Sequence, residues 1–384
     1  MKFTNLIRAG AAAALTGGIG LVATSGVAGA VAFGPSGQQV HALFVESEST
    51  SGDNVLSYWR SSDGTISYAG TYATGGDGVA AAGATADPLA SQGGLTLINN
   101  DTELVAVNSL SDTVSVFAVN GPQLTLLQQV ASQGEFPVSV ASDGNLVAVL
   151  NAGGEGSVAE YRLLGDFLVA LPGQVRNLNL GLSNTNPPDF HHGAGEVAYT
   201  PNGQHLIIST KLSTDSFDVF SVGFLGNLSA SPVVTPSHTA LPFAFTFDSA
   251  GNVVSAEAAT SSVSTYGVNT NGTLTWLGTV SEDQAALCWI SGANGYFYGS
   301  NAGSGTVSSF DESATGAPQL VNAVAATAHA GTIDSAVSPG GSTLYVESGG
   351  AGTIDAYKIG SGGVLTQIET IFNVPLASEG IAVS

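Results

Sequence analysis

Residues 286–310 read ALCWISGANGYFYGSNAGSGTVSSF. The stretch contains an apolar run, a tight turn at Asn294 and Gly295, an aromatic run ending at Asn301, a second glycine-rich turn and a third apolar run. Short runs rich in Val, Ile and aromatic residues, separated by residues that accept positive φ, are typical of antiparallel strands joined by hairpin turns. We therefore expect three consecutive strands here.

The same order of signals recurs along the chain, so this stretch is one copy of a repeat. Similar segments occupy residues 95–119, 137–163, 196–222, 242–268 and 332–359. A looser apolar segment, such as 320–326, supplies a fourth strand. Helical periodicity is essentially absent, and a repeat of this kind with a period in the forties is typical of four-stranded propeller blades. The first apolar residue of the third run lies at Val55, Val114, Val158, Phe217, Val263, Val307 and Ile354, at spacings of 59, 44, 59, 46, 44 and 47 residues.

The two ends of the repeat array complement each other. The first unit begins with QVHALFVES (39–47) and lacks a first strand, whereas PLASEGIAVS (375–384) follows the last unit and aligns with a first strand. Joining them closes the ring and removes the exposed edge that an open array would present. An open solenoid would need polar capping repeats, and none is visible. We predict an all-β, seven-bladed β-propeller closed by the C-terminal strand joining the first blade.

The N-terminal segment has the pattern of a secretory signal peptide. Lys2 and Arg8 precede a stretch of small apolar residues, and cleavage sites of the small-x-small type follow, after Ala30 or Ala32. A membrane anchor is the alternative, but glycines interrupt the apolar run. We predict a signal peptide at 1–32 and a secreted propeller domain at 33–384, extracellular or periplasmic and free of the membrane after cleavage.

The charge balance limits the partners. The chain has seven Lys and Arg residues and 29 Asp and Glu residues. Without Lys2 and Arg8, which lie in the predicted signal peptide, the formal net charge is 5 − 29 = −24. Nucleic acid and anionic membrane surfaces are therefore excluded, because the field of the protein repels polyanions. The lone Cys288 lies among apolar residues and is expected to be a buried, unreactive thiol. A monomer that holds a small molecule in its central channel is the expected form.

One face of the ring concentrates polar residues. In each blade the start of the first strand and the end of the second lie at the same face, which also receives four of the six histidines. Connector 177–196 is expected to be the longest between blades, as a lid or a simple insertion. The face is either a solvated loop surface or the rim of a pocket, where His acts as base or ligand and carboxylates bind a cation such as Ca²⁺. No metal-ligand motif or required cofactor is identified. The candidate positions are Asn108, Asn151, Lys211, Glu257, Asn301, Ser348, Glu46 to Glu48, His191, His192, His238 and His329.

The repeats resemble those of the seven-bladed propeller lactonase family, which includes propeller-type 6-phosphogluconolactonase and fungal 3-carboxymuconate cyclase. The resemblance rests on segments such as SNAGSGTVSSF (300–310) and AVSPGGSTLYVES (336–348). It implies a catalytic His before a first strand, a Glu after a second strand and arginines that hold an anionic substrate. Glu257 matches the Glu. Gly195 stands at the His position, with His191 and His192 just upstream.

The family's arginines are missing. Pro242-Phe243-Ala244 and Asn301-Ala302 stand where the resemblance implies Pro-Arg-His and Asn-Arg, so an anionic lactone is a poor substrate. One hypothesis is a lactonase-like hydrolase of a neutral or cationic lactone or sugar-derived ring. In it Glu257 or His192 activates water and Lys211 or a bound cation stabilises the oxyanion. The alternative is a non-catalytic extracellular propeller that binds a ligand or protein. The substrate-binding candidates are Asn108, Asn151, Asn301, His238 and His329, with His191 beside His192 as a catalytic candidate.

Overall fold

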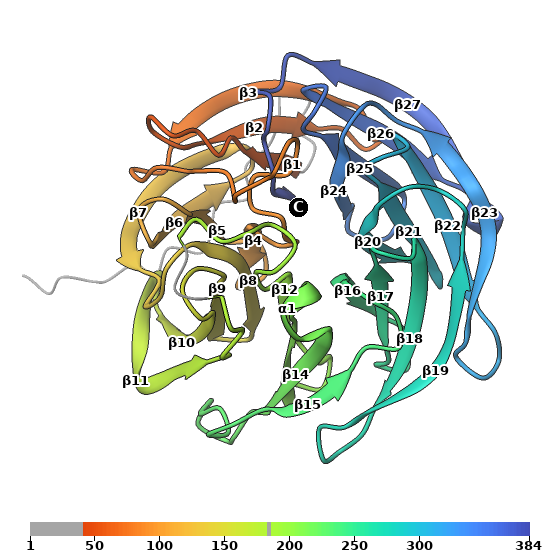
Figure 1. Ribbon diagram of the computed structural model, residues 1–384. Coiled ribbons are helices and arrows are strands. Elements are labelled where there is room, and N and C mark those ends of the chain that lie inside the picture. The colour runs from red at the N-terminus through yellow and green to blue at the C-terminus, as the bar shows by residue number, and fades with distance from the viewer. Residues whose placement is uncertain (1–40, 183–185) are drawn as a thin grey trace, which may run out of the picture. The chain divides into compact units, whose positions relative to one another are not determined.

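The computed structural model describes residues 41–182 and 186–384, which form seven four-stranded antiparallel sheets arranged as blades around a central axis (Figure 1). The predicted seven-bladed β-propeller is confirmed. The predicted signal peptide at 1–32 lies outside the described residues, as do 33–40 of the predicted propeller domain.

Each blade consists of four strands, which follow one another from the innermost to the outermost. Blade 1 contains β28 (Ile381–Val383), β1 (His41–Glu46), β2 (Asn54–Arg60) and β3 (Ile66–Ala73); blade 2 contains β4 (Leu95–Ile98), β5 (Glu103–Asn108), β6 (Thr113–Asn120) and β7 (Gln123–Ala131). Blade 3 contains β8 (Pro137–Asp143), β9 (Leu146–Asn151), β10 (Ser157–Leu164) and β11 (Phe167–Asn177); blade 4 contains β12 (Glu196–Tyr199), β13 (His205–Ser209), β14 (Ser216–Ser221) and β15 (Val233–Pro236). Blade 5 contains β16 (Pro242–Phe247), β17 (Val253–Glu257), β18 (Ser262–Val268) and β19 (Leu274–Ser281); blade 6 contains β20 (Leu287–Ala293), β21 (Tyr296–Asn301), β22 (Thr306–Glu312) and β23 (Pro318–Thr327). Blade 7 contains β24 (Thr332–Val337), β25 (Thr343–Ser348), β26 (Thr353–Ile359) and β27 (Leu365–Phe372).

Helix is confined to two short segments in the described part of the chain. A single α-helical turn, α1 (Lys211–Thr214), follows β13, and a 3₁₀ turn, η1 (Ser361–Gly363), links β26 to β27. In residues 41–182 and 186–384, no helix has the length and apolar character needed to cross a membrane.

The ring closes as the sequence predicts. β28 pairs antiparallel with β1, and the partners include Phe44 with Ala382 and Val45 with Ile381. Beyond this ladder, the Ser384 amide donates to the Ala42 carbonyl at 2.9 Å, and the Arg60 guanidinium donates twice to the Ser384 carbonyl at 3.0 and 2.7 Å. The final residues thus complete blade 1.

The core lies between neighbouring blades. Each blade presents apolar side chains on both faces, so β5 is buried at every residue and so is β13. The repeated third-strand residues from Val55 to Ile354 are all buried within these contacts. Burial of apolar surface drives this packing. Each blade needs its neighbours to exclude water from its apolar faces.

The innermost strands of several blades are irregular near their first residues. Register shifts occur between Pro242 and Phe245 in β16 and between Leu287 and Trp289 in β20, and β8 and β24 have similar shifts. A bulge leaves residues of one strand unpaired and redirects their side chains. Phe243 and Cys288 lie in such bulges, at the end of the ring that contains the cavity described below.

Candidate functional site

A connector enters the centre of the ring. Residues 74–94 join β3 to β4 and are more numerous than residues 178–195, which join β11 to β12. The expectation that connector 177–196 is the longest is therefore wrong. The difference matters because residues 85–93 run across the channel, where Ala86 passes so close to Gly349 that a Cβ there would lie 2.3 Å from the Ala86 carbonyl oxygen.

Gln92 fixes this connector to the inner strands. Its side-chain amide donates to Glu196 of β12 at 3.2 Å and to the Ile290 carbonyl of β20 at 3.2 Å, and its own carbonyl accepts the Ile290 N–H at 3.1 Å. The Trp289 indole donates to the Ser91 carbonyl at 2.7 Å. The connector is thus held by blades 4 and 6. It lines two hollows, one with Gln92 and Gly93 and the other with Thr85 to Asp87.

The same connector is held from the other side by Glu379. The Glu379 carboxylate accepts backbone N–H groups from Leu89 at 2.6 Å, Ala90 at 3.3 Å and Ser91 at 3.1 Å. Burial raises the pKa of Glu379 well above its usual range, although these N–H donors oppose the rise. The segment that precedes the closing strand therefore also anchors the channel connector.

The larger hollow is a cavity of about 700 Å³ at the end of the ring where the first strands begin. Thr85 to Asp87 contribute part of its lining, and residues of blades 5 to 7, α1 and connector 178–195 contribute the rest. Small residues follow the second strands here, such as Ala258 and Ala302, and leave room for a ligand. The lining residues are Thr85, Ala86, Asp87, Phe190, His191, Leu212, Leu241, Phe243, Ala258, Ala259, Ala286, Cys288, Ala302, Gly303, Gly331 and Gly350.

Lys211 supports the cavity wall. Its ammonium group donates to the Ala90 carbonyl at 2.8 Å and to the Phe190 carbonyl at 2.6 Å, and lies 5.2 Å from the centroid of the Phe243 ring. Burial lowers the pKa of Lys211 to about 8, and the nearby Asp87 carboxylate opposes this shift. Lys211 therefore ties together the two long connectors that line the cavity.

Asp87 is the carboxyl group that lines this cavity. Burial raises its pKa above the usual range, and the charge of Lys211 pulls it back down. A carboxylate in a mostly apolar cavity, with a pKa moved towards neutrality, is suited to accept a proton from water. Sequence reasoning missed Asp87, which lies outside the repeats.

The predicted histidine pair lies at the rim. His191 lines the cavity and its ring packs on Phe190 with centroids 3.7 Å apart, while the His192 Nδ1 lies 2.8 Å from the Asp189 Oδ1. Both imidazoles are about half exposed, at 47% of their side-chain surface. Asp189 holds His192 in one orientation, as an orienting carboxylate does for a catalytic base.

Glu257, the predicted catalytic carboxylate, lies behind the cavity wall. It is fully buried and accepts hydrogen bonds from the Ser237 hydroxyl at 3.0 and 2.8 Å and from the Tyr266 hydroxyl at 3.0 Å. Burial raises the pKa of Glu257 to about 8, and the two hydroxyl donors oppose the rise. The residues that follow it, Ala258 and Ala259, line the cavity instead.

The three predicted asparagines hold strands together. Asn108, Asn151 and Asn301 are fully buried at the ends of their second strands, outside the cavity lining. The Asn301 amide donates to the Thr306 hydroxyl at 3.1 Å and to the Ser308 hydroxyl at 2.8 Å. Asn108 makes equivalent bonds to Thr113 and Ser115, and Asn151 bonds to Ser132 and Ser157.

The other two predicted histidines contact outer strands. His238 stacks on Trp276 of β19 with ring centroids 4.0 Å apart, and the His329 Nδ1 lies 2.8 Å from the Asp355 carboxylate of β26. Neither residue lines the cavity. Of the predicted site residues, the structure brings His191, His192 and Lys211 together around the cavity and places the others elsewhere.

Cys288 is buried, as expected, but it also lies in the wall of the cavity. The thiol is free and buried, and burial raises its pKa, as expected for an unreactive cysteine. It also lines the cavity, beside the bulge in β20. The cavity wall at this point is therefore apolar in character.

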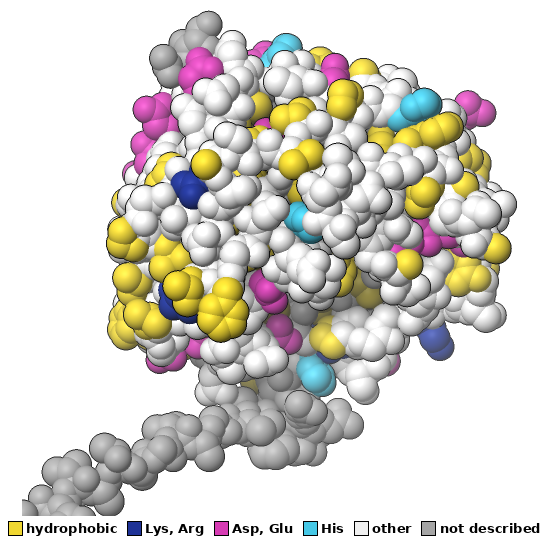
Figure 2. Space-filling view, turned by 90° about the horizontal axis from the view of Figure 1, so that it is seen from below, with side chains coloured by type: hydrophobic (Ala, Val, Ile, Leu, Met, Phe, Trp, Pro, Cys, Tyr) yellow, Lys and Arg dark blue, Asp and Glu magenta, His cyan; other side chains and the backbone are white. Residues whose placement is uncertain are grey.

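Arginine does not reach the cavity formed by the described residues. Arg162 donates to the Leu225 carbonyl and Arg176 to the Leu228 carbonyl, so both tie the outer parts of blades 3 and 4 together. Figure 2 shows how sparse Lys and Arg are on one face of the molecule. The predicted absence of an arginine clamp for anions holds for this cavity.

Comparison with known proteins supports the fold. No protein-family model matches the sequence, and no curated protein does. Among solved structures, a proposed 6-phosphogluconolactonase of Bacteroides fragilis has 18% identity and a TM-score of 0.69, covering 90% of this chain and 98% of its own. The periplasmic gluconolactonase PpgL of Pseudomonas aeruginosa has 18% identity and a TM-score of 0.67, covering 90% and 99%. A protein from Lactobacillus plantarum has 18% identity and a TM-score of 0.70, covering 90% and 100%. The resemblance to propeller lactonases is confirmed at the level of the fold.

Proposed function

We propose that this protein is a secreted lactonase-like hydrolase that opens a neutral, largely apolar lactone in the 700 Å³ cavity. The observation that carries the proposal is the cavity itself, which combines apolar walls with the Asp87 carboxylate and has His191 at its rim. The propeller fold shared with a periplasmic gluconolactonase supports the reaction class and the location outside the cytoplasm. The apolar walls and missing arginines support a substrate without charge.

The reaction uses one water molecule. Asp87 accepts a proton from water as the water oxygen attacks the lactone carbonyl carbon, and the ring C–O bond of the tetrahedral intermediate then breaks. The leaving oxygen takes the proton back from Asp87, which gives a hydroxy carboxylic acid. Lys211 favours the charged form of Asp87, because its ammonium group lies nearby in a poorly solvated region.

The charge of the protein favours product release. The substrate is neutral, whereas the ring-opened product carries a carboxylate, and the chain has a formal net charge of −22. The overall field therefore repels the product more than the substrate.

His192, held by Asp189, is a second candidate base at the rim.

The test is hydrolysis of a panel of neutral γ- and δ-lactones with alkyl chains of increasing length, followed by proton release. We expect turnover to favour the apolar lactones over gluconolactone, and Asp87→Asn to lower kcat at least 100-fold, as loss of a general base does. Glu160→Gln is the matched control, since Glu160 is a buried carboxyl bonded to Tyr199 and lies outside the cavity lining. It should stay within about twofold of the wild type.

Other results would replace the proposal. If kcat survives in Asp87→Asn but falls in His192→Ala or Glu257→Gln, the base is one of the residues predicted from the sequence. If no lactone is hydrolysed but apolar lactones still bind, the protein is the non-catalytic binding propeller.

A further inference from the structure

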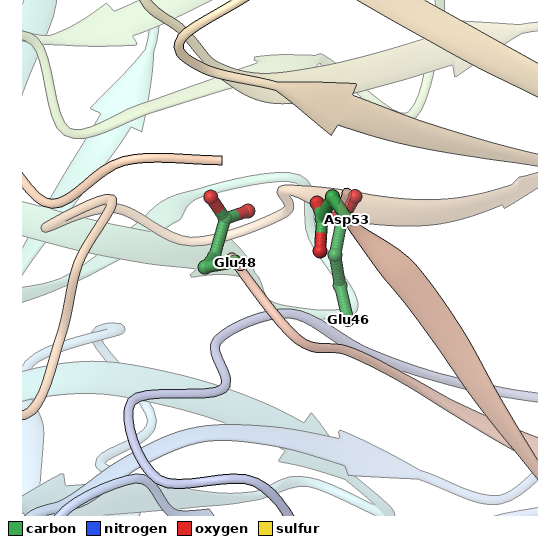
Figure 3. Close-up of side chains that lie close together, drawn as sticks. All are labelled: Glu46, Glu48 and Asp53. Atoms are coloured by element: carbon green, nitrogen blue, oxygen red, sulfur yellow. The ribbon is translucent and has the colours of Figure 1, made fainter. Parts of the chain in front are cut away.

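The turn between β1 and β2 brings three carboxyl groups together. Glu46 ends β1, Glu48 lies in the turn, and Asp53 directly precedes β2. One oxygen of each lies within 4.8 Å of the others, and Figure 3 shows the carboxyl groups of Glu46 and Asp53 side by side with that of Glu48 near them. The exposed fractions are 0% for Glu46, 6% for Glu48 and 0% for Asp53. The cluster is thus shielded from solvent.

Two of the six carboxyl oxygens in the cluster accept hydrogen bonds from the protein. One oxygen of Asp53 accepts from the Ser47 hydroxyl at 2.7 Å and from the Asn54 N–H at 2.7 Å, and one oxygen of Glu48 accepts from the Ser109 hydroxyl at 3.1 Å. The second oxygen of Asp53, the second of Glu48 and both oxygens of Glu46 have no hydrogen-bond partner. Buried polar atoms normally have partners. A single buried carboxyl group such as Glu347 also lacks them, but among the described residues only this cluster brings three such groups together, and this combination points to a ligand from outside the chain.

The charge of the cluster has no counterpart in the protein. In the described residues, the ion pairs involve only His191, His192 and His329, all far along the chain from this turn. Burying several carboxylates without an opposite charge is costly, and a cation would remove that cost.

The backbone around Glu48 is held in place by connector 74–94. Glu48 has a φ of 50°, and the Gly78 N–H donates to the Ser49 carbonyl at 2.9 Å. A Cβ at Gly78 would lie 2.6 Å from the Glu48 carbonyl carbon, so the glycine allows this close approach. The carboxyl group of Glu48 is therefore directed inward by its surroundings.

We propose that Glu46, Glu48 and Asp53 bind one Ca²⁺ ion. Ca²⁺ takes six to eight oxygen ligands at about 2.3–2.6 Å, so oxygens bound to one ion lie no more than about 5 Å apart. The three oxygens of this cluster lie within 4.8 Å of one another and meet that condition. Mg²⁺ needs ligands at about 2.0–2.1 Å, and Zn²⁺ is usually bound through nitrogen or sulfur. The ion offsets two of the three negative charges that the cluster can carry, and it secures blade 1, the blade that contains both the first and the last strand.

The test uses the full chain after treatment with EDTA. Isothermal titration should show one Ca²⁺ bound per chain, and thermal unfolding should show a rise in Tm with Ca²⁺ that exceeds the rise with equal Mg²⁺. Glu46→Gln and Asp53→Asn should each weaken Ca²⁺ binding at least tenfold. Glu347→Gln is the matched control, because Glu347 pairs with Ile354 as Glu46 pairs with Val55, is fully buried and also has two unpartnered oxygens, but lies outside the cluster. It should weaken Ca²⁺ binding much less than Glu46→Gln does, because its carboxyl group acts on Glu48 only from outside the cluster.

Two outcomes would overturn the proposal. One is an unchanged Tm with no heat of Ca²⁺ binding, together with a higher Tm for Glu46→Gln, which would mean that protons alone neutralise the cluster. The other is equal loss of Ca²⁺ binding in Glu347→Gln and Glu46→Gln, which would place the ion elsewhere. If a variant does not fold, competition between Ca²⁺ and Tb³⁺ on the wild type, followed by Tb³⁺ luminescence, decides whether the chain binds Ca²⁺ at all; no competition rejects the site.

Discussion

In blade 1 and in blade 6, a turn joins the second strand to the third. The two turns occupy the same place in their blades but carry different polar side chains. Glu46 pairs with Val55 as Ser300 pairs with Val307. In blade 6 the Asn301 amide bonds to two hydroxyls of the next strand, whereas in blade 1 three carboxyl groups leave four oxygens without partners. At this turn blade 6 leaves only neutral polar atoms without partners, the Asn301 Oδ1 and the Ser300 hydroxyl, whereas blade 1 leaves carboxyl oxygens that need a counter-charge.

Blade 5 provides an intermediate case. Glu257 pairs with Ser262 as Asn301 pairs with Thr306, and Ser237 and Tyr266 donate to its carboxyl group. Two hydroxyl donors reduce the cost of burying one carboxyl group but do not remove it, because its pKa is still raised to about 8. The three turns thus differ in their buried carboxyl groups: blade 6 has none at this position, the one in blade 5 accepts two hydroxyl donors, and blade 1 has three with four unpartnered oxygens.

The largest effect is expected when blade 1 loses its closing strand. Removal of residues 381–384 deletes the β28–β1 ladder and the bonds between Ser384, Ala42 and Arg60. At roughly 1 kcal/mol for each hydrogen bond, the free energy of unfolding should fall by about 5 kcal/mol and the Tm by several degrees. Hydrogen exchange should speed up in β1 and β2 much more than in β21 and β22. An unchanged melting curve would contradict closure by this strand.

A smaller effect is expected when a buried carboxyl group, as found in blade 1, is introduced into the turn of blade 6. Asn301→Asp keeps the shape but loses the amide donors and adds a buried charge near Glu282, which already bonds to Ser308. The free energy of unfolding should fall by about 3 kcal/mol at pH 8. Since burial raises the pKa of such an Asp, the loss should shrink as the pH falls and the group takes up a proton.

Asn301→Ala is the control for this substitution. It removes the same donors without adding a charge, so its loss of stability should depend on pH much less, and only through the interaction of Asn301 with Glu282. Denaturant unfolding at pH 5 and pH 8 makes the comparison. Equal losses for Asn301→Asp at both values would mean that blade 6 already neutralises a carboxylate at this position.

The smallest effect on the free energy of unfolding at mildly acidic pH is expected for Glu257→Gln in blade 5. The folded pKa of Glu257, about 8, lies above the usual value of 4.5, so the folded state holds the proton more tightly. Its contribution to stability is therefore lost as the pH rises from about 4.5 to 8, by up to about 1.4 kcal/mol per pH unit. Glu257→Gln should be close to neutral at pH 5 and gain on the wild type as the pH rises. Parallel pH profiles for the two proteins would refute this assignment.

The fold could be predicted from the sequence because its signals are local and repeated. Each blade carries its own strands and turns, as residues 286–310 illustrate, and the incomplete first unit matches the surplus strand at 381–383. The third-strand residues from Val55 to Ile354 were aligned correctly because each occupies the same buried place. Closure needed only the comparison of the two chain ends.

The candidate site could be predicted only in part. His191 and Lys211 were found because polar residues at the ends of second strands and in connectors share one face. Connector 74–94 has no strand pattern, and its course depends on partners distant in sequence, such as Glu379 and Ile290. One signal was available: both spacings of 59 residues, Val55 to Val114 and Val158 to Phe217, contain the connectors that line the cavity.

Polarity at the strand ends also gave an incomplete guide. Asn301 and Glu257 are polar residues that bond to nearby hydroxyl groups and do not line the cavity. A sequence does not show whether a polar side chain turns towards a neighbouring hydroxyl or towards a cavity. Asp53 escaped notice because its role depends on the turn that returns it to Glu46. Long-range geometry, and not residue type, separates these cases.

The bond between Leu89 and Glu379 joins residues 290 positions apart. During synthesis at about 5–20 residues per second, roughly 15 to 60 s pass between the appearance of the two. Blades 2 to 6 can form in that interval, but connector 74–94, which contributes Thr85 to Asp87 to the cavity lining, still lacks its bond to Glu379. The cavity can therefore be completed only after the last residues of the chain have been made, when all the other residues that line it are already present.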